Sequence, residues 1–323
     1  WWRQLAFSVL GLGAFIGCVV IDYRALGRWS WLLYLGGLGL LVAVLIIGEE
    51  INNAKSWIRL AGFTLQPSEL AKPAVILFLA WLASRPVFRI NRMLDLIIFG
   101  MLACLPIALI AKQPDYGTAL VFVPGIFAIL FVGGLSWRII CTALVVVLLA
   151  SPLAYNFVLA PHQRERIQTF VNPGEDISDT GWNAHQSLIA VGSGGMTGKG
   201  FMKGNKHVLG YLPKTVASTD FIFSVIGEET GFIGAGAAVC AFLGILICCL
   251  RTAATAADRF GSLICAGVTG VLITHVYVNI GMTVRAAPII GIPLPFLSYG
   301  GSFMLGTMIC LGLVQSVHVR RDA

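Results

Sequence analysis

Residues 29–48 read WSWLLYLGGLGLLVAVLIIG, a run of 20 residues without a single charge. Such a run is as long as a helix that crosses the hydrocarbon core of a bilayer. The whole chain of 323 residues has the same character, with 57% hydrophobic and 11% charged residues and a mean hydropathy of +0.86. A soluble domain carries about 25% charged residues. The composition therefore excludes a water-soluble protein and predicts an integral membrane protein.

Further apolar segments predict about nine membrane-spanning helices. Helices are expected because lipid offers no partner for the backbone groups of an open strand. We therefore predict an all-α integral membrane protein, a single polytopic helix bundle over residues 1–323 with a long connection at 159–219. The chain begins at Trp1 without a methionine, which favours a missing preceding segment. The expected spans are 3–21, 29–48, 68–84, 93–111, 118–135, 137–158, 220–250, 259–282 and 296–317.

Basic residues divide the connections into two kinds. Positive residues mark the cytoplasmic side, so the connections that carry them and the C-terminus are predicted to be cytoplasmic. The remaining connections are then extracytoplasmic, and they hold most of the polar residues that a simple bundle would not need. Function is expected on that face, where no nucleotide triphosphate is available. The marking arginines are at positions 24, 28, 85, 89, 92, 138, 251, 259, 320 and 321, and the opposite connections are 49–69, 112–118, 159–219 and 285–301.

The first extracytoplasmic connection leads into a span through Gln66-Pro-Ser-Glu69. Proline, serine and glutamate suit the first turn of a helix, so a simple helix cap is one interpretation. Lys72 favours a functional one, because an unpaired ammonium inside an apolar span is costly and should face the bundle interior or a wet cavity.

The second such connection, Lys112-Gln-Pro-Asp-Tyr-Gly-Thr118, is either a polar turn capped by Asp115 or part of a site. Lys112 is expected at the same membrane level as Lys72, with Arg59 nearby in depth. Such cations suit a phosphate or pyrophosphate group better than a neutral solute.

The long connection contains a glycine-rich run, Val-Gly-Ser-Gly-Gly-Met-Thr-Gly-Lys-Gly at 191–200. It is not a nucleotide P-loop, because glycine follows Lys199 and no strand precedes the run. We expect it to fold closely over a surface or a ligand. The histidines at 162, 185 and 207 lack a metal-ligand spacing. The eight cysteines all lie in apolar runs, where they are expected to pack rather than to form disulfides or a metal site.

Two further groups of polar residues border the last spans. Asp220, where the long connection meets an apolar helix, is either a helix N-cap or a general base whose pKa is set by burial. Of Glu228 and Glu229, one is expected to pair within the bundle. The Pro- and Gly-rich stretch that follows Asn279 predicts a broken helix, which is tolerated only where it is buried or lines a cavity.

Taken in this order, the motifs make the chain resemble the SEDS family of cell-wall polymerases (shape, elongation, division and sporulation), and its RodA branch more than its FtsW branch. The resemblance implies a ten-helix bundle of which this chain lacks the first helix. The link at 214–218 departs from the family pattern. The motifs are Lys55-Ser-Trp-Ile-Arg59, Gln66-Pro-Ser-Glu69, Lys112 to Thr118, Gly192-Ser-Gly-Gly195 with Gly198-Lys-Gly200, Thr219-Asp-Phe-Ile-Phe223 and Gly291 to Gly301.

The resemblance implies an inverting glycosyltransferase that polymerises lipid II into glycan strands at the outer face of the bacterial cytoplasmic membrane, during cell elongation and shape maintenance. It implies a class B penicillin-binding protein and other elongation-complex membrane proteins as partners, and no nucleic acid. The family's essential aspartate falls on Asp220. Its substrate-binding residues are expected at Lys55, Trp57, Arg59, Gln66, Glu69, Lys72, Lys112, Gln113, Asp115, Thr118, Lys199 and Ser298.

Our hypothesis is that Asp220 deprotonates the acceptor hydroxyl for attack on the donor's anomeric carbon. Four cations, with or without a divalent ion (Mg²⁺ or Mn²⁺), would neutralise the departing lipid pyrophosphate, and no nucleotide would be needed. These cations are Lys55, Arg59, Lys72 and Lys112. The alternatives are a lipid II flippase, because broken helices and mid-depth cations also suit transporters, a division-specific FtsW-type polymerase, and a non-catalytic scaffold.

Overall fold

The computed structural model describes residues 2–322 except 52–53, 61–62, 158, 160, 172–178 and 205–216. Most of the link at 214–218 that departs from the family pattern lies outside the described residues. The chain forms two compact units. Unit 1 comprises Trp1–Gly134, Gly244–His275 and Tyr299–Ala323, and unit 2 comprises Leu135–Leu243 and Val276–Ser298. The prediction of one domain over 1–323 stays a prediction.

Each of the nine predicted spans coincides with a helix in the described part of the chain. Six of these helices, α2, α4, α6, α11, α12 and α13, are long and apolar enough to cross a membrane. The helical membrane bundle is therefore confirmed, and the count of nine spans stays a prediction. The helices are α1 (Trp2–Val20), α2 (Tyr23–Ile47), α3 (Pro67–Ser84), α4 (Met93–Ala111), α5 (Tyr116–Val132), α6 (Trp137–Phe157), α11 (Ile222–Ala254), α12 (Arg259–Thr283) and α13 (Gly301–Val319).

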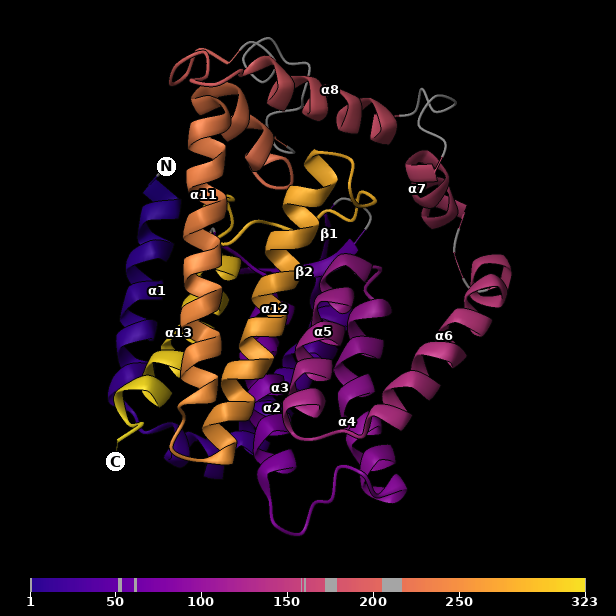
Figure 1. Cartoon of the computed structure of the whole chain (residues 1–323), viewed down its shortest axis with the longest axis vertical. Helices are drawn as coiled ribbons and strands as arrows, with labels where there is room; N and C mark the ends of the chain where they lie inside the picture. The colour runs from indigo at the N-terminus through magenta and orange to yellow at the C-terminus, as the bar shows by residue number, and fades with distance from the viewer. Residues whose placement is uncertain are drawn as a thin grey trace. The chain divides into compact units, whose positions relative to one another are not determined.

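Unit 1 is a bundle in which α1 packs along α13, α2 packs along α3, and α4 and α5 pack against α3 (Figure 1). Glycines allow two of the closest approaches. A Cβ at Gly306 would come 2.6 Å from the backbone oxygen of Glu69, and one at Gly125 would come 2.8 Å from the Val271 side chain. Small residues at such crossings let helix backbones approach and gain packing energy where lipid supplies no hydrophobic force.

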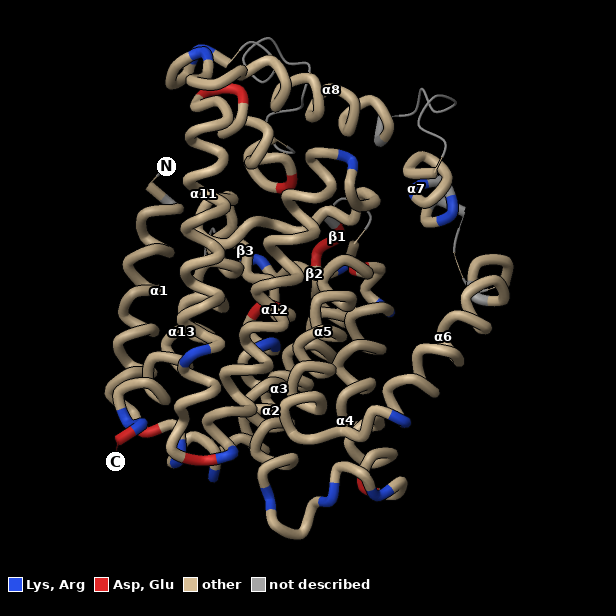
Figure 2. Tube along the Cα trace, in the orientation of Figure 1, with Lys and Arg blue, Asp and Glu red and all other residues tan. Residues whose placement is uncertain are grey.

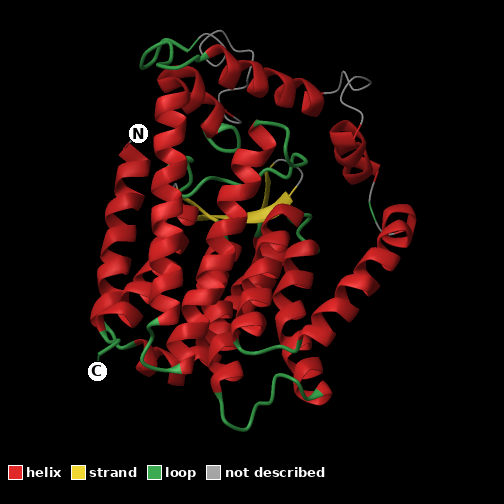
Figure 3. Ribbon diagram, viewed as in Figure 1, coloured by secondary structure: helices red, strands yellow, loops and turns green. Residues whose placement is uncertain are grey.

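Three short strands in unit 1 correct the all-α prediction. The strands β1 (Glu49–Ile51), β2 (Ala54–Leu60) and β3 (Phe63–Leu65) form an antiparallel sheet in the order β1-β2-β3 (Figure 3). Arg59 is opposite Thr64, and Glu49 is opposite Trp57. Residues 54–60 alternate along a strand, so Lys55, Trp57 and Arg59 share one face of it. The backbone groups of these residues form hydrogen bonds within the sheet. The helix-only prediction had placed the same residues in a connection without regular structure.

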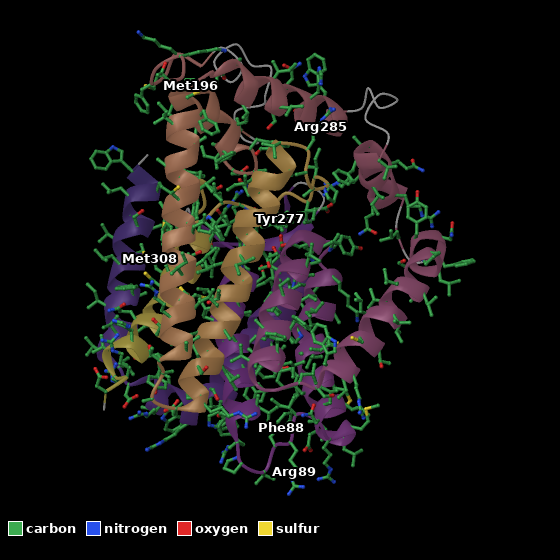
Figure 4. The ribbon with its side chains drawn as sticks, viewed as in Figure 1. Phe88, Arg89, Met196, Tyr277, Arg285 and Met308 are labelled. Carbon is green, nitrogen blue, oxygen red and sulfur yellow. The ribbon has the colours of Figure 1, made fainter. Side chains whose placement is uncertain are left out.

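The opposite ends of the unit 1 helices gather the basic residues (Figure 2). Phe88 and Arg89, for example, lie in the connection between α3 and α4 (Figure 4). Asp258 ties these ends together, because its carboxylate accepts hydrogen bonds from Tyr23 Oη (2.8 Å), Arg24 Nε (2.9 Å) and the Gly261 amide (2.7 Å). Burial acts to raise the pKa of Asp258, but these hydrogen bonds and the Arg24 charge outweigh it and hold the pKa below its usual value.

We expect Asp258→Asn to lower the stability of the protein by about 1–3 kcal/mol at neutral pH, since the charged acceptor is lost. A lowered folded-state pKa contributes stability that is present above the unfolded pKa of about 3.9 and is lost as the pH falls through the folded value. The difference in thermal unfolding between native protein and variant in detergent should therefore be full at pH 7 and shrink below about pH 4. A constant difference across that range would contradict the assignment.

Unit 2 contains the long connection, which was expected as a loop but, among its described residues, holds the helices α7 (Pro161–Val171) and α8 (Asp179–Ser193). Its described core is formed by Phe223 and Phe242 of α11 together with Leu294, and the partly buried Ile280 of α12 packs against them. The stretch that follows α12 is therefore anchored in this unit by buried residues such as Leu294, while other residues of the stretch, such as Val284, are exposed. It is not helical from Ala287 to Leu294, as the Pro and Gly content predicted.

The glycine-rich run of unit 2 fills a break in α11. Gly231, with φ +67° and ψ −165°, interrupts that helix. The amides of Phe232 and Ile233 beyond the break donate to the carbonyls of residues 195 and 196, and the Glu228 and Glu229 carbonyls accept from the amides of residues 199 and 200. The run thus replaces the hydrogen bonds that the break removes, which agrees with the expectation of close packing over a surface.

We expect Gly198→Ala to destabilise unit 2 by at least about 2 kcal/mol. Gly198 has φ +78°, and a Cβ there would overlap the Glu229 carbonyl. Gly192→Ala is the matched control, because a Cβ at that position meets nothing within 4 Å and φ is not positive. Thermal unfolding of the two variants in detergent is the measurement, and equal stability would show that the run does not depend on this contact.

Candidate active site

Asp220 lies in a turn of unit 2 that two buried side chains hold in place. Asn279 of α12, fully buried, donates from Nδ2 to the carbonyl of Asp220 (2.8 Å) and to that of Ile292 (2.7 Å). Ser298 donates from Oγ to the Thr219 carbonyl (2.6 Å) and accepts from the Leu294 amide (2.7 Å). The turn before α11 is therefore joined to the irregular segment 284–298 by side-chain amide and hydroxyl groups.

The Asp220 side chain faces this segment at Gly291. A Cβ at Gly291 would lie 3.3 Å from Asp220 Oδ2, and its φ of +77° is one that other residues rarely adopt. Gly291 thus provides both the backbone bend and the space beside the carboxylate. No first-turn amide of α11 donates to this carboxylate among the described residues, so the geometry favours the general-base interpretation over an N-cap.

The environment of Asp220 suits a proton acceptor. Burial raises the pKa of its carboxyl, whereas a hydrogen bond with Thr219 and the charge of Arg166 act in the opposite direction. A base with a raised pKa binds a proton more readily than an exposed aspartate. Of the residues expected in the site, unit 2 brings Asp220 and Ser298 together.

We expect Asn279→Asp to destabilise the Asp220 turn, because a carboxylate oxygen would replace the donor that faces two carbonyls. Leaving two buried carbonyls without a donor costs about 2–4 kcal/mol in total. Asn279→Leu should show a similar loss, since it also lacks the donor. The midpoint of thermal unfolding in detergent should therefore fall, and an Asn279→Asp protein as stable as the native chain would contradict this role.

In unit 1, Glu69 and Lys72 form a buried ion pair on α3. Lys72 Nζ lies 2.7 Å from Glu69 Oε2 and 3.1 Å from His275 Nε2, and both members of the ion pair are only about 4% exposed. Phe303 packs on the His275 ring at 4.8 Å and lies 5.4 Å from the ammonium. A small cavity is lined by Glu69, Lys72 and His275 together with residues of α12 and α13. Lys72 is therefore inside the bundle, as its position in an apolar span predicted.

We expect Glu69→Gln to cost about 3–5 kcal/mol, because it leaves the buried ammonium without its counter-charge. Adding Lys72→Met should restore much of that stability. Glu49→Gln is the control: its ion pair with Arg59 (3.0 Å) is exposed, so the loss should stay below about 1 kcal/mol. Equal thermal shifts for the two single variants would contradict the difference in burial.

A second polar group in unit 1 joins three expected residues. Gln66 donates from Nε2 to Asp115 Oδ2 (2.7 Å), and Asp115 Oδ1 accepts from the Thr118 amide (3.1 Å), which caps α5 as predicted. The backbone amide of Gln66 donates to Ser302 Oγ (3.0 Å). Gln113 is buried and donates to the Leu41 carbonyl (3.1 Å). These side chains link the ends of α3, α5 and α13.

The remaining expected residues are engaged locally or exposed. Lys55 donates to the last carbonyls of α2, at 2.9 and 3.1 Å, and so complements the negative end of that helix. Arg59 pairs with Glu49, Trp57 is half-buried on β2, and Lys112 is exposed. In unit 2, Lys199 pairs with Glu228 at 2.7 Å, so one of the two adjacent glutamates does pair within the protein.

Sequence reasoning did not assign the residues that position these groups. Asn279, His275 and Ser302 all lie in apolar helices, and their only signal is a polar side chain where lipid would disfavour one. Arg166, which acts on Asp220, lies in the long connection beside Arg164, and the sequence does not distinguish the two. Among the described residues, no group of three or more His, Cys, Asp or Glu is placed to hold a metal ion.

Comparisons with known proteins place these features in context. A family model for cell cycle proteins of the FtsW/RodA/SpoVE type matches residues 1–323. The chain is 37% identical to the peptidoglycan glycosyltransferase MrdB of Escherichia coli K12, over 99% of this chain and 85% of that protein. It is 31% identical to the peptidoglycan glycosyltransferase RodA of Treponema pallidum, over 99% and 89%. A chain in a solved peptidoglycan synthase complex, described as coordinating polymerization and crosslinking, is 33% identical with a TM-score of 0.85, over 99% and 89%.

Proposed function

This chain belongs to the FtsW/RodA/SpoVE family of cell cycle proteins, and we propose on that basis that it is a peptidoglycan glycosyltransferase that polymerises lipid II into glycan strands. The relatives MrdB and RodA are named for this activity. The observation that carries the proposal within this chain is the buried Asp220, fixed by Asn279 and Ser298 beside Gly291. A multi-pass membrane enzyme can meet a lipid-linked sugar in the bilayer.

In the proposed reaction Asp220 accepts the proton of the acceptor sugar hydroxyl. The acceptor oxygen then bonds to the anomeric carbon of the donor, and the bond from that carbon to the diphosphate oxygen breaks with inversion. The electron pair leaves with the lipid diphosphate. No nucleotide is needed, because cleavage of the donor's own glycosyl phosphate bond drives the transfer.

The polar groups of unit 1 complete the proposal. Glu69, Lys72, Gln66, Asp115 and Thr118 form two fixed clusters, and we assign them to binding the lipid-linked substrate and nascent glycan. Lys112 and Trp57 supply a cation and an aromatic face for the same task. A divalent cation, Mg²⁺ or Mn²⁺, would supply further positive charge for the diphosphate, but the described residues offer no cluster of His, Cys, Asp or Glu to hold it.

The proposed membrane orientation and partners follow from the positions of the basic residues and from the similar proteins. The arginines at the α1–α2, α3–α4 and α11–α12 connections and after α13 support a cytoplasmic C-terminus, with Asp220 on the extracytoplasmic side of the bacterial cytoplasmic membrane. The likeness to a chain of a peptidoglycan synthase complex supports a crosslinking partner, a class B penicillin-binding protein. The MrdB and RodA relatives support a role in cell elongation alongside other membrane proteins of that complex.

The test is glycan synthesis from lipid II by the purified chain with its crosslinking partner in liposomes. We expect Asp220→Asn to lower the rate by about 10²–10⁴-fold, the usual contribution of a general base. Asp322→Asn, in the exposed C-terminal tail, is the matched control and should be fully active. Unchanged synthesis by a folded Asp220→Asn protein would refute the base assignment, and no synthesis by the native pair would refute the polymerase.

A further inference from the structure

Unit 2 contains a pocket that no step described so far uses. Its cavity volume is about 50 Å³, and it is partly open to the outside. Arg166 and Phe170 of α7, Ala184 of α8, Met282 at the end of α12 and Arg285 beyond it contribute to its wall, together with residues 287–289. Figure 4 labels Arg285 where the chain leaves α12. Elements that are far apart in sequence thus bring two guanidinium groups to one cavity.

The two arginines are available to an anion. Among the described residues neither guanidinium forms an ion pair with a carboxylate. Within the described part of the chain, the hydrogen bonds of Arg166 are long contacts of 3.5 Å to the carbonyls of Ile289 and Ile290. Arg285 has φ +58°, a strained backbone conformation for a residue with a side chain, and the surrounding structure must hold it there. Such strain is more common at functional sites than elsewhere.

The pocket is connected to Asp220 through the chain itself. The residues 287–289 that line it lead directly to Gly291, which lies against the Asp220 carboxylate. Arg166 is also the cation whose charge acts on Asp220. An anion held by Arg166 would therefore lie beside the segment after α12, whose Gly291 faces the Asp220 carboxylate.

Three of the four cations first expected to serve the diphosphate have other partners, and the fourth, Lys112, is exposed. Lys55 is bound to carbonyls at the end of α2, Arg59 to Glu49, and Lys72 to Glu69. In the described structure neither Arg166 nor Arg285 forms an ion pair of this kind, although the charge of Arg166 acts on Asp220. Arginine is also the better ligand, because its planar guanidinium donates two parallel hydrogen bonds to a phosphate group.

We propose that this pocket binds the diphosphate of the lipid-linked donor, with Arg166 and Arg285 as its ligands. The proposal rests on the proposed function and names the place where the leaving group is held. As the anomeric carbon's bond to the diphosphate breaks, the electron pair moves to the phosphate oxygen, and the two guanidinium groups stabilise the charge that develops there. The acceptor's proton goes to Asp220 on the adjoining segment.

The first test measures binding of inorganic pyrophosphate to the full chain in phosphatidylcholine nanodiscs by calorimetry. Arg166→Gln and Arg285→Gln should each weaken binding about tenfold or more, and the Lys substitutions should restore part of it. Lys203→Gln, an exposed cation of the same unit outside the pocket, is the matched control for lost charge and should bind as the native chain does. No binding by the native chain, or equal binding by all variants, would overturn the proposal.

The second test distinguishes a substrate diphosphate from a phospholipid headgroup as the bound anion. It also distinguishes failure of the anion site from failure of the proposed polymerase activity. Nanodiscs that contain phosphatidylglycerol should leave pyrophosphate affinity unchanged; strong competition would assign the pocket to a bilayer headgroup instead. With lipid II, the Arg variants should raise KM or lower kcat at least tenfold. If the variants lose pyrophosphate binding and the native pair shows no polymerisation, the anion site is supported and the proposed polymerase activity is rejected. Normal polymerisation by both Arg variants would reject the site alone.

Discussion

The two hydrogen bonds that the Asn279 side-chain amide donates fix the backbone around Asp220, and they thereby allow unit 2 to hold a carboxylate at the end of a membrane helix. In a bilayer, a broken helix exposes backbone carbonyls that water cannot satisfy, and each one costs free energy unless a side chain donates to it. Asn279 donates to Asp220 and Ile292 at once, so one buried amide fixes both sides of the site. Ser298 likewise joins the two sides, because it donates to the Thr219 carbonyl and accepts from the Leu294 amide.

The same constraint explains the second irregular region of unit 2. Gly231 breaks α11, and the glycine-rich run supplies both the donors and the acceptors that the break leaves unpaired. Glycine is needed there because a side chain at Gly198 would overlap the helix backbone. The run that resembles a phosphate-binding loop in composition is therefore a structural partner of a helix. The pocket between α7, α8 and the segment after α12 offers the phosphate contacts instead.

The buried charge of Lys72 in unit 1 also needs partners within the protein. Lys72 is in an apolar helix only because Glu69 and His275 surround its ammonium. The sequence predicted that Lys72 would be buried, because an ammonium inside a span has few alternatives. It did not predict the His275 contact, since the partners are 203 residues apart and no pattern of local spacing joins them.

How far the sequence predicts the structure depends on the range of the interaction. Long apolar runs predicted the helices, because the length of a span and its hydrogen bonding are local properties. The strands at 49–65 were missed because three to seven residues of alternation are a weak signal beside the helical expectation for lipid. The helices at 161–171 and 179–193 were missed because they are polar and lie in a long connection. Asp220 was identified by its motif, whereas Asn279 and the two pocket arginines needed three-dimensional proximity.

The pH dependence of glycosyl transfer, measured in a single turnover with the native chain and its partner, tests the central claim that Asp220 is the base. A base must be deprotonated to act, so the rate should rise with pH and level off above the pKa of Asp220, which burial places higher than that of an exposed aspartate. The residual rate of Asp220→Ala should lack this rise. A rise that persists unchanged in Asp220→Ala, or a native rate that is flat over the acidic range, would show that another group accepts the proton.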